Sequence, residues 1–250
     1  MAPDHFSVSQ LTTYLACPRK WRLRYIDEVE PERTSADLVL GGAVHSAIEW
    51  WQTARIEGRE VDLAGAQRIF RADWDAGIAA PKVEFNGSTS AEMRILGAEL
   101  VRLFVEHFTA QPPPEAVEER FEVALRDPAT GMEHGLPLVG YQDYVAGEVV
   151  GEIKTASRKQ QLSNWDLQLA AYSYAHRETT GCKPRLQVVQ LVKTKEPKLE
   201  VTETEISDEQ EAWFLEVAIS ALGSIESGAF HPTPSWMCPR CEYRRACRGR

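Results

Sequence analysis

The chain has 250 residues, of which 43% are apolar and 26% are charged. These fractions are close to the average of globular proteins, so they exclude a largely disordered chain and fit one soluble domain with its own core. No stretch approaches the roughly 18 consecutive apolar residues of a membrane span, and the first residues lack the basic and apolar segments of a signal peptide. We therefore expect a cytoplasmic protein without a membrane partner.

Although the net charge is −9, the chain contains two short basic segments. Residues 17–25 and 238–250 each carry a charge of +4, which leaves −17 for the rest of the chain. Each segment begins at a cysteine, and together they contain Arg19, Lys20, Arg22, Arg24, Arg240, Arg244, Arg245, Arg248 and Arg250. Basic side chains of this density can bind nucleic-acid phosphates, and two solvated helix faces are the alternative.

Helical patterns dominate the first 110 residues. Apolar residues at helical spacing predict four helices, over about 7–25, 42–55, 63–78 and from 89 to the prolines at 112–114. Capping boxes mark two of the starts, since Ser7 is followed by Gln10 and Thr89 by Glu92.

Beyond the prolines the apolar residues alternate, as they do in strands. The pattern predicts five strands and two helices, with strands near 117–125, 139–145, 150–154, 186–192 and 199–206 and helices near 163–178 and 207–227. We expect an α/β protein in which helices flank a central mixed sheet. One domain over 1–250 would then contain a mainly helical part at 1–110, an α/β core at 115–228 and a cysteine-rich segment at 229–250.

The second and third predicted strands form the most informative hairpin. Gly147 and Glu148 fit a two-residue type II′ turn, which places Asp143 opposite Glu152 with Cβ atoms roughly 5 Å apart. A turn at Ala146 and Gly147 is the alternative, and it would make the two acids diagonal neighbours on the same face. Lys154 follows Glu152 by two positions and shares its face. Two carboxylates this close repel each other unless a cation lies between them. The hairpin predicts a divalent-metal site beside a lysine, or else a surface hairpin with a Glu–Lys pair.

The order of motifs in this chain resembles that of a known family. Asp143 with Glu152-Ile153-Lys154 resembles the D…(D/E)-x-K core of the PD-(D/E)XK nuclease superfamily. Three further segments resemble motifs of its RecB-like branch, and they are Gly42–His45, Val117–Phe121 and Gln168–Tyr172. The resemblance extends from about residue 7 to residue 247 and implies a restriction-endonuclease-like core.

The same resemblance implies roles for single residues. Asp143, Glu152, His45 and the carbonyl of Ile153 would hold Mg²⁺ or Mn²⁺, and Lys154 would assist the attacking water. Gln168 and Tyr172 would support the site or contact DNA. Either Glu118 or Glu119 is a further candidate acid, with an ordinary strand charge as the alternative.

The five cysteines suggest a metal site or free thiols, because a cytosolic chain rarely carries disulfides. Cys238, Cys241 and Cys247 have the spacing C-x2-C-x5-C, and a four-ligand site needs Cys17 or Cys182 as well. We choose Cys17, because it lies beside a proline and basic residues, as the three C-terminal cysteines do. The spacing resembles the iron–sulfur subset of RecB-like nucleases, which implies a [4Fe–4S] cluster, with zinc as the alternative.

These features together predict a function. We expect a metal-dependent deoxyribonuclease, an exonuclease on single-stranded DNA ends, whose cluster joins the two basic segments into one DNA-binding patch. Aromatic residues near that patch could stack on bases or simply pack, and they are Tyr14, Trp21, Tyr25, Trp236 and Tyr243. The resemblance includes CRISPR-associated, AddB-type and phage nucleases, so CRISPR-adaptation or recombination and repair proteins are candidate partners. The alternative is a DNA-binding or complex-forming subunit that cuts only with partners, or not at all.

Overall fold

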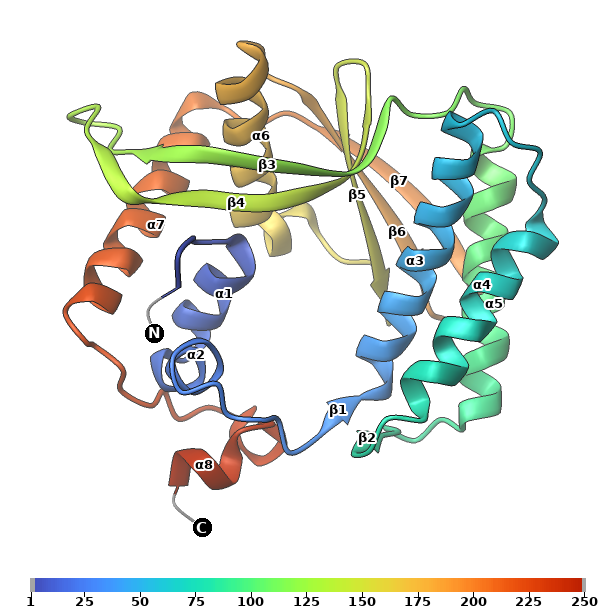
Figure 1. The fold of residues 1–250 in the computed structure, drawn as a ribbon, viewed down its shortest axis with the longest axis horizontal. Helices are drawn as coiled ribbons and strands as arrows, with labels where there is room; N and C mark the ends of the chain where they lie inside the picture. Colours follow the sequence, from blue (N-terminus) through green and yellow to red (C-terminus); the bar gives the residue numbers. More distant parts are fainter. Residues whose placement is uncertain (1–2, 249–250) are drawn as a thin grey trace.

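The structure, a computed structural model, describes residues 3–248. Its centre is a five-stranded sheet in the order β3-β4-β5-β6-β7 (Figure 1). These strands are β3 (Ala116–Arg126), β4 (Glu133–Ala146), β5 (Val149–Ala156), β6 (Arg185–Val192) and β7 (Lys198–Thr204). β5 and β6 pair in parallel, and the other neighbours pair antiparallel. The mixed sheet confirms the predicted fold class.

Helices cover both faces of the sheet (Figure 1). One layer consists of α3 (Ala36–Ile56), α4 (Leu63–Ile78) and α5 (Ser90–Phe108), and the other contains α1 (Val8–Ala16), α6 (Asp166–Thr180) and α7 (Asp208–Glu226). Strand β6 contributes Leu186 and Val188 to the core under α6 and α7, and Val189 and Leu191 to the core under α3–α5. A strand that is covered on both faces carries apolar residues on both of them, and five of the eight residues of β6 are apolar.

The prediction of one continuous helix over 7–25 is wrong. The segment forms α1 and a separate helix, α2 (Pro18–Tyr25), and Cys17 between them has extended backbone angles of φ −165° and ψ 105°. Pro18 is the cause, because a proline excludes the preceding residue from the helical conformation and itself fits the first turn of a new helix. The thiol of Cys17 therefore lies at a corner between two helices.

Short elements connect the ends of the chain to this core. They are β1 (Thr34–Ser35), which pairs with β2 (Val83–Glu84), and the C-terminal turn η2 (Cys238–Arg240) and helix α8 (Arg244–Arg248). Helix α8 packs beside α2 (Figure 1), so the two basic segments meet. Across residues 3–248, every helix is too short or too polar to cross a membrane.

Candidate active site

Strands β4 and β5 separate from each other next to the predicted acids, and we call this point of separation the fork. The ladder pairs residues 144–146 with 149–151, which confirms the two-residue turn at Gly147 and Glu148. Gly147 has φ 59°, a value that this turn requires and that glycine adopts without strain. The β4–β5 ladder ends at the pair Tyr144–Gly151, although β4 continues its pairing with β3. Asp143 is therefore the first residue of β4 beyond the fork.

The backbone of β5 holds the carboxylate of Asp143. The N–H of Ile153 donates a hydrogen bond of 2.5 Å to Oδ2 of Asp143. This bond satisfies an N–H group that β4 leaves unpaired at the fork, and it fixes the orientation of the carboxylate. Asp143 and Glu152 thus lie on the two arms of the fork, whereas the sequence had predicted a direct cross-strand pair.

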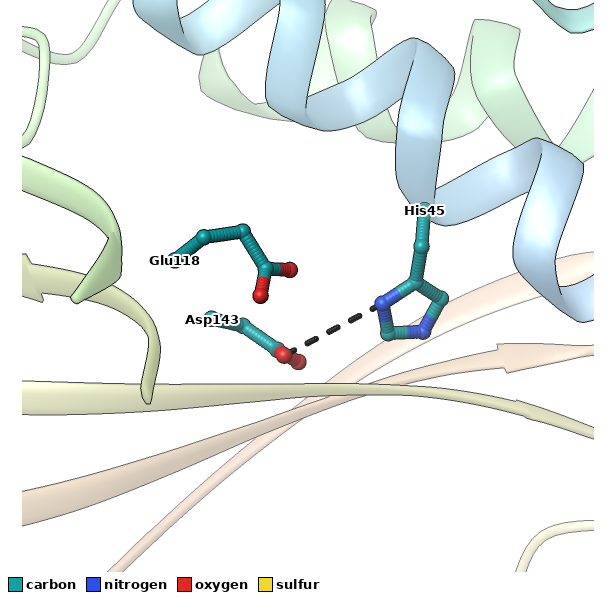
Figure 2. A group of neighbouring side chains, drawn as sticks. All are labelled: His45, Glu118 and Asp143. Atoms are coloured by element: carbon teal, nitrogen blue, oxygen red, sulfur yellow. Dashed lines mark ion pairs between the residues drawn. The ribbon is translucent and has the colours of Figure 1, made fainter. Parts of the chain in front are cut away.

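Three possible metal ligands meet at this fork. Figure 2 shows His45 of α3, Glu118 of β3 and Asp143 of β4 pointing toward one another. One ligand atom from each lies within 4.8 Å of the other two, and residues 3–248 contain no other such group of histidine, cysteine or acidic side chains. Nδ1 of His45 is 3.9 Å from Oδ1 of Asp143. One imidazole nitrogen and two carboxylate oxygens are suitable ligands for a divalent cation.

Glu118 reaches the site through an unusual backbone conformation. It lies opposite Asp143, because the β3–β4 register pairs the residues on either side of both. Its φ of 47° is uncommon for a residue other than glycine, and such strain concentrates at functional sites. Glu119 is exposed and lies outside the three-residue group. The structure therefore places Glu118, and not Glu119, at the site.

Helix α3 brings His45 down to the sheet. A Cβ atom on Gly41 would lie 3.2 Å from Oγ1 of Thr155, so the helix approaches β5 closely at this glycine. His45 follows one turn later on the same face of the helix. The glycine at this approach directly precedes the motif Gly42–His45 that the sequence indicated, and a Cβ atom on Gly42 itself would meet nothing within 4 Å.

A hydrogen-bond network positions the lysine. Nζ of Lys154 lies 2.5 Å from Oε1 of Glu152 and donates to Oε1 of Gln168 at 2.9 Å. Nε2 of Gln168 donates to Oε2 of Glu152 at 2.9 Å and to the hydroxyl of Tyr172 at 3.0 Å. That hydroxyl donates to the carbonyl of Tyr141 at 2.6 Å. An amide suits this place, because its oxygen accepts from the lysine while its nitrogen donates to the carboxylate.

Glu152 has different surroundings from the other predicted acid, Asp143. Glu152 is 3% exposed and contacts Lys154 and Gln168, outside the group formed by His45 and the other two acids. The ammonium of Lys154 balances its buried charge. Gln168 and Tyr172 join helix α6 to both arms of the fork.

The electrostatics of the fork favour a bound cation. Desolvation, followed by the charge of Glu152, raises the pKa of Asp143 well above its usual value. Desolvation also raises the pKa of Glu118, with Glu49 and Glu152 adding to the effect. Burial lowers the pKa of His45, which keeps its imidazole neutral and able to bind a metal. A divalent cation would relieve the repulsion between the carboxylates.

Four of the five cysteines lie together where α2 meets the C-terminal segment. A cavity of about 200 Å³ between α2 and the C-terminal segment is lined by Cys17, Cys238, Cys241 and Cys247. Cys182 is exposed and does not line it. The N–H groups of Thr233 and Ser235 donate to the sulfurs of Cys17 and Cys238 at 3.4 and 3.3 Å. The hydrogen bond from Ser235 lowers the pKa of the Cys238 thiol, and the thiolate is the form that binds metals.

Several basic residues near the cysteines are paired with acids. Lys20 lies 2.8 Å from Glu242, and Arg22 lies 3.2 Å from Asp27. Arg245 lies 3.8 Å from Glu32, and Arg33 lies 3.2 Å from Glu84. Five arginines of the two basic segments line two neighbouring depressions, one with Arg24 and Arg240 and the other with Arg244, Arg245 and Arg248. Arg33 lines both depressions, and no sequence pattern indicated it because it lies outside the two basic segments. Arg19 lines neither depression, and Arg250 is outside the described residues.

The aromatic residues near the patch mostly pack. Tyr14, Trp21 and Tyr243 are buried, and the hydroxyl of Tyr14 donates to the carbonyl of Ala229 at 2.8 Å. Tyr25 packs against the same core, whereas Trp236 is 86% exposed. Stacking of Tyr14, Trp21 or Tyr243 on bases is therefore excluded by their burial.

Comparison with known families agrees with this geometry. The family model of the PD-(D/E)XK nuclease superfamily matches residues 5–248. The chain therefore belongs to this superfamily, a class of nucleases that use divalent metals and act on DNA. The superfamily assignment from the motif order is confirmed.

Two individual proteins are similar to this chain, one over part of its length and the other over nearly all of it. The Gene 69 protein of Mycobacterium phage L5 is 38% identical over 112 residues, and this match covers 40% of the chain but only 38% of the phage protein. A crystallised candidate exonuclease from Eubacterium rectale superimposes with a TM-score of 0.65 at 16% identity, over 98% of this chain and 88% of that one. At this identity the second likeness shows a shared fold.

Proposed function

We propose that the protein is a metal-dependent deoxyribonuclease, an exonuclease that hydrolyses single-stranded DNA from its ends. The observation that carries the proposal is the convergence of His45, Glu118 and Asp143 beside the buried Glu152–Lys154 pair. Asp143, Glu118 and His45 would hold Mg²⁺ or Mn²⁺, with Glu152 and the Ile153 carbonyl as further ligands. A bound metal would lower the pKa of a water molecule and neutralise charge on the phosphate.

Lys154 would act on the reacting groups directly. Gln168 and Glu152 hold its ammonium in one place, so it is preorganised to donate a hydrogen bond to the attacking water or to a phosphate oxygen. The water oxygen would attack phosphorus and the P–O bond to the leaving sugar would break. Because every group needed for this step is present in one chain, the site favours an autonomous nuclease over an inactive subunit.

The four clustered cysteines would hold a [4Fe–4S] cluster. Zinc and iron–sulfur clusters both accept four thiolates. The four cysteines line one cavity but contain only one C-x2-C pair, whereas structural zinc usually has two. This spacing supports the cluster over zinc and the RecB-like iron–sulfur branch, and residues 1–250 would form one nuclease domain closed by the cluster.

The arginine-lined depressions beside the cluster would bind the DNA backbone. Arg33 connects the depression of Arg24 and Arg240 to that of Arg244 and Arg248. Guanidinium groups in such a row suit successive phosphates. An acidic protein would in this way present a local basic path to DNA.

A cleavage assay on end-labelled oligonucleotides tests the proposal. Anaerobically purified protein should degrade linear single-stranded DNA in Mn²⁺ but not in a chelator, and it should leave circular single-stranded DNA intact. Lys154→Ala should slow cleavage at least 100-fold while retaining DNA binding, because it removes a group that acts in the transition state. Lys159→Ala is the matched control, since this lysine is exposed and pairs with Glu200 on the surface.

A different result would contradict each part of the proposal. Wild-type cleavage by Lys154→Ala would show that the active site lies elsewhere, and equal cleavage of circular DNA would show an endonuclease. The visible absorption spectrum and metal content of the same preparation test the cluster, because zinc without iron would contradict it.

A further inference from the structure

A groove next to the active site has no role in the steps described above. It has a volume of about 530 Å³ and lies between the start of α1, the start of α6 and helix α7. Lys154 and Gln168 of the active-site network form part of its lining, and so do Trp165 and Trp213. The groove is therefore continuous with the place where the reacting phosphate would lie.

The walls of the groove have the chemistry of a base-binding site. Trp213 is 48% exposed and Trp165 is partly buried, so aromatic surface is available for stacking. Ser9 and Asn164 are exposed and add neutral hydrogen-bonding groups. Among the described residues that line the groove, Lys154 is the one basic side chain, so phosphate binding cannot be the purpose of most of it. Its volume falls within the range of sites for small ligands.

We propose that this groove receives the unpaired base of a nucleotide adjacent to the scissile phosphate, with Trp213 as the stacking partner. The inference rests on the proposed function and adds a substrate determinant to it. A base can enter such a groove only when it is free of its complementary strand. The groove thus supplies a physical reason for a preference for single-stranded ends.

The test compares two substrates and three variants. Wild-type protein should cleave oligothymidylate about tenfold more efficiently, in kcat/KM, than an oligomer of the same length that has no bases, because base–aromatic stacking contributes a factor of this order. Trp213→Ala should lose this preference and leave cleavage of the abasic oligomer unchanged, and Trp213→Phe should restore most of it. Glu216→Ala, an exposed change on the same helix, should keep the wild-type ratio.

Other outcomes would overturn the inference. An unchanged ratio in Trp213→Ala would show that Trp213 contacts no base, and an equal loss on both substrates would show a structural role. If the wild type cleaves neither oligomer, the proposed function fails, and binding of the two oligomers by fluorescence anisotropy then decides the inference separately. In that measurement, Trp213→Ala must weaken binding of oligothymidylate alone.

Discussion

Asp143 has two roles whose energetic requirements conflict. Its carboxylate accepts the hydrogen bond from Ile153 that fixes the fork, and it lies near Glu118 and Glu152 in a poorly hydrated place. An ionised side chain is needed to bind a metal, but in the folded protein desolvation and the neighbouring negative charges favour the protonated form. Function and stability therefore oppose each other at this residue.

Asp143→Asn should make this conflict measurable. Asparagine keeps an acceptor for the Ile153 N–H and removes the charge, so without added divalent metal the free energy of unfolding at pH 7 should rise by about 1 kcal/mol while cleavage is lost. Urea denaturation of both proteins measures the difference. A less stable variant would show that the hydrogen bond to the ionised carboxylate outweighs the repulsion.

The same pair of proteins should differ in pH dependence. Because the folded-state pKa of Asp143 is raised, its unfavourable contribution is fully present above that pKa and disappears as the pH falls toward the unfolded value. The difference in the free energy of unfolding between Asp143→Asn and the wild type should therefore decrease as the pH is lowered. Glu119→Gln, an exposed change in the neighbouring strand β3, is the control and should show no such trend.

At the scale of elements, the break between α1 and α2 determines where the first cysteine lies. Cys17→Ala should deplete iron and lower the thermal midpoint, because ligand loss and unfolding are coupled when one site joins distant parts of a chain. Cys182→Ala should do neither, since this thiol is exposed and outside the cavity. Full iron content in Cys17→Ala, with depletion in Cys182→Ala, would reverse the choice of the fourth ligand.

Local signals in the sequence predicted most elements correctly. The capping box at Thr89–Glu92 is present, and the hairpin turns at Gly147 and Glu148 as the spacing indicates. At the start of α1 only half of the predicted box forms, because the N–H of Gln10 donates to the Ser7 hydroxyl while the side-chain amide of Gln10 donates to the carbonyl of His5. The break at Cys17 was missed because the helical pattern continues across it, although Pro18 was a visible signal. Each of these features depends on residues close together in the chain.

The missed parts of the site depend on tertiary structure. Nothing in the local pattern distinguishes Glu118 from Glu119, because a strained backbone at one residue decides which side chain faces Asp143. Arg33 likewise becomes part of a basic path only when the chain ends meet. The divergence of β4 from β5 is also invisible to spacing arguments, which assume a regular ladder.

For the whole molecule, the distribution of charge matters more than its sum. Replacing Arg244 and Arg245 with alanine should weaken binding to all DNA sequences alike, because phosphate contacts carry no sequence information. The slope of log K against log salt concentration should flatten by about 0.7 for each single-strand phosphate that the variant no longer neutralises. Cleavage at saturating DNA should change little.

A salt titration with a matched control decides this point. Arg94→Ala removes a half-buried arginine that pairs with Asp75 on the helical layer and lines neither depression, and it should leave the slope unchanged. An unchanged slope in the Arg244 and Arg245 variant as well would show that DNA follows another path.

The cavity that unites Cys17 with three cysteines far along the chain has a consequence for biosynthesis. The ribosome makes Cys17 221 residues before Cys238, which at 5 to 20 residues per second corresponds to about 10 to 40 s. The strands and helices between them can fold during this time, but the cavity is complete only when the C-terminal segment, which lines one side of it, has left the ribosome. If the cavity holds the proposed cluster, iron and sulfide would be delivered only after the core has been translated, and Cys17 would wait as a free thiol until its three partners are made.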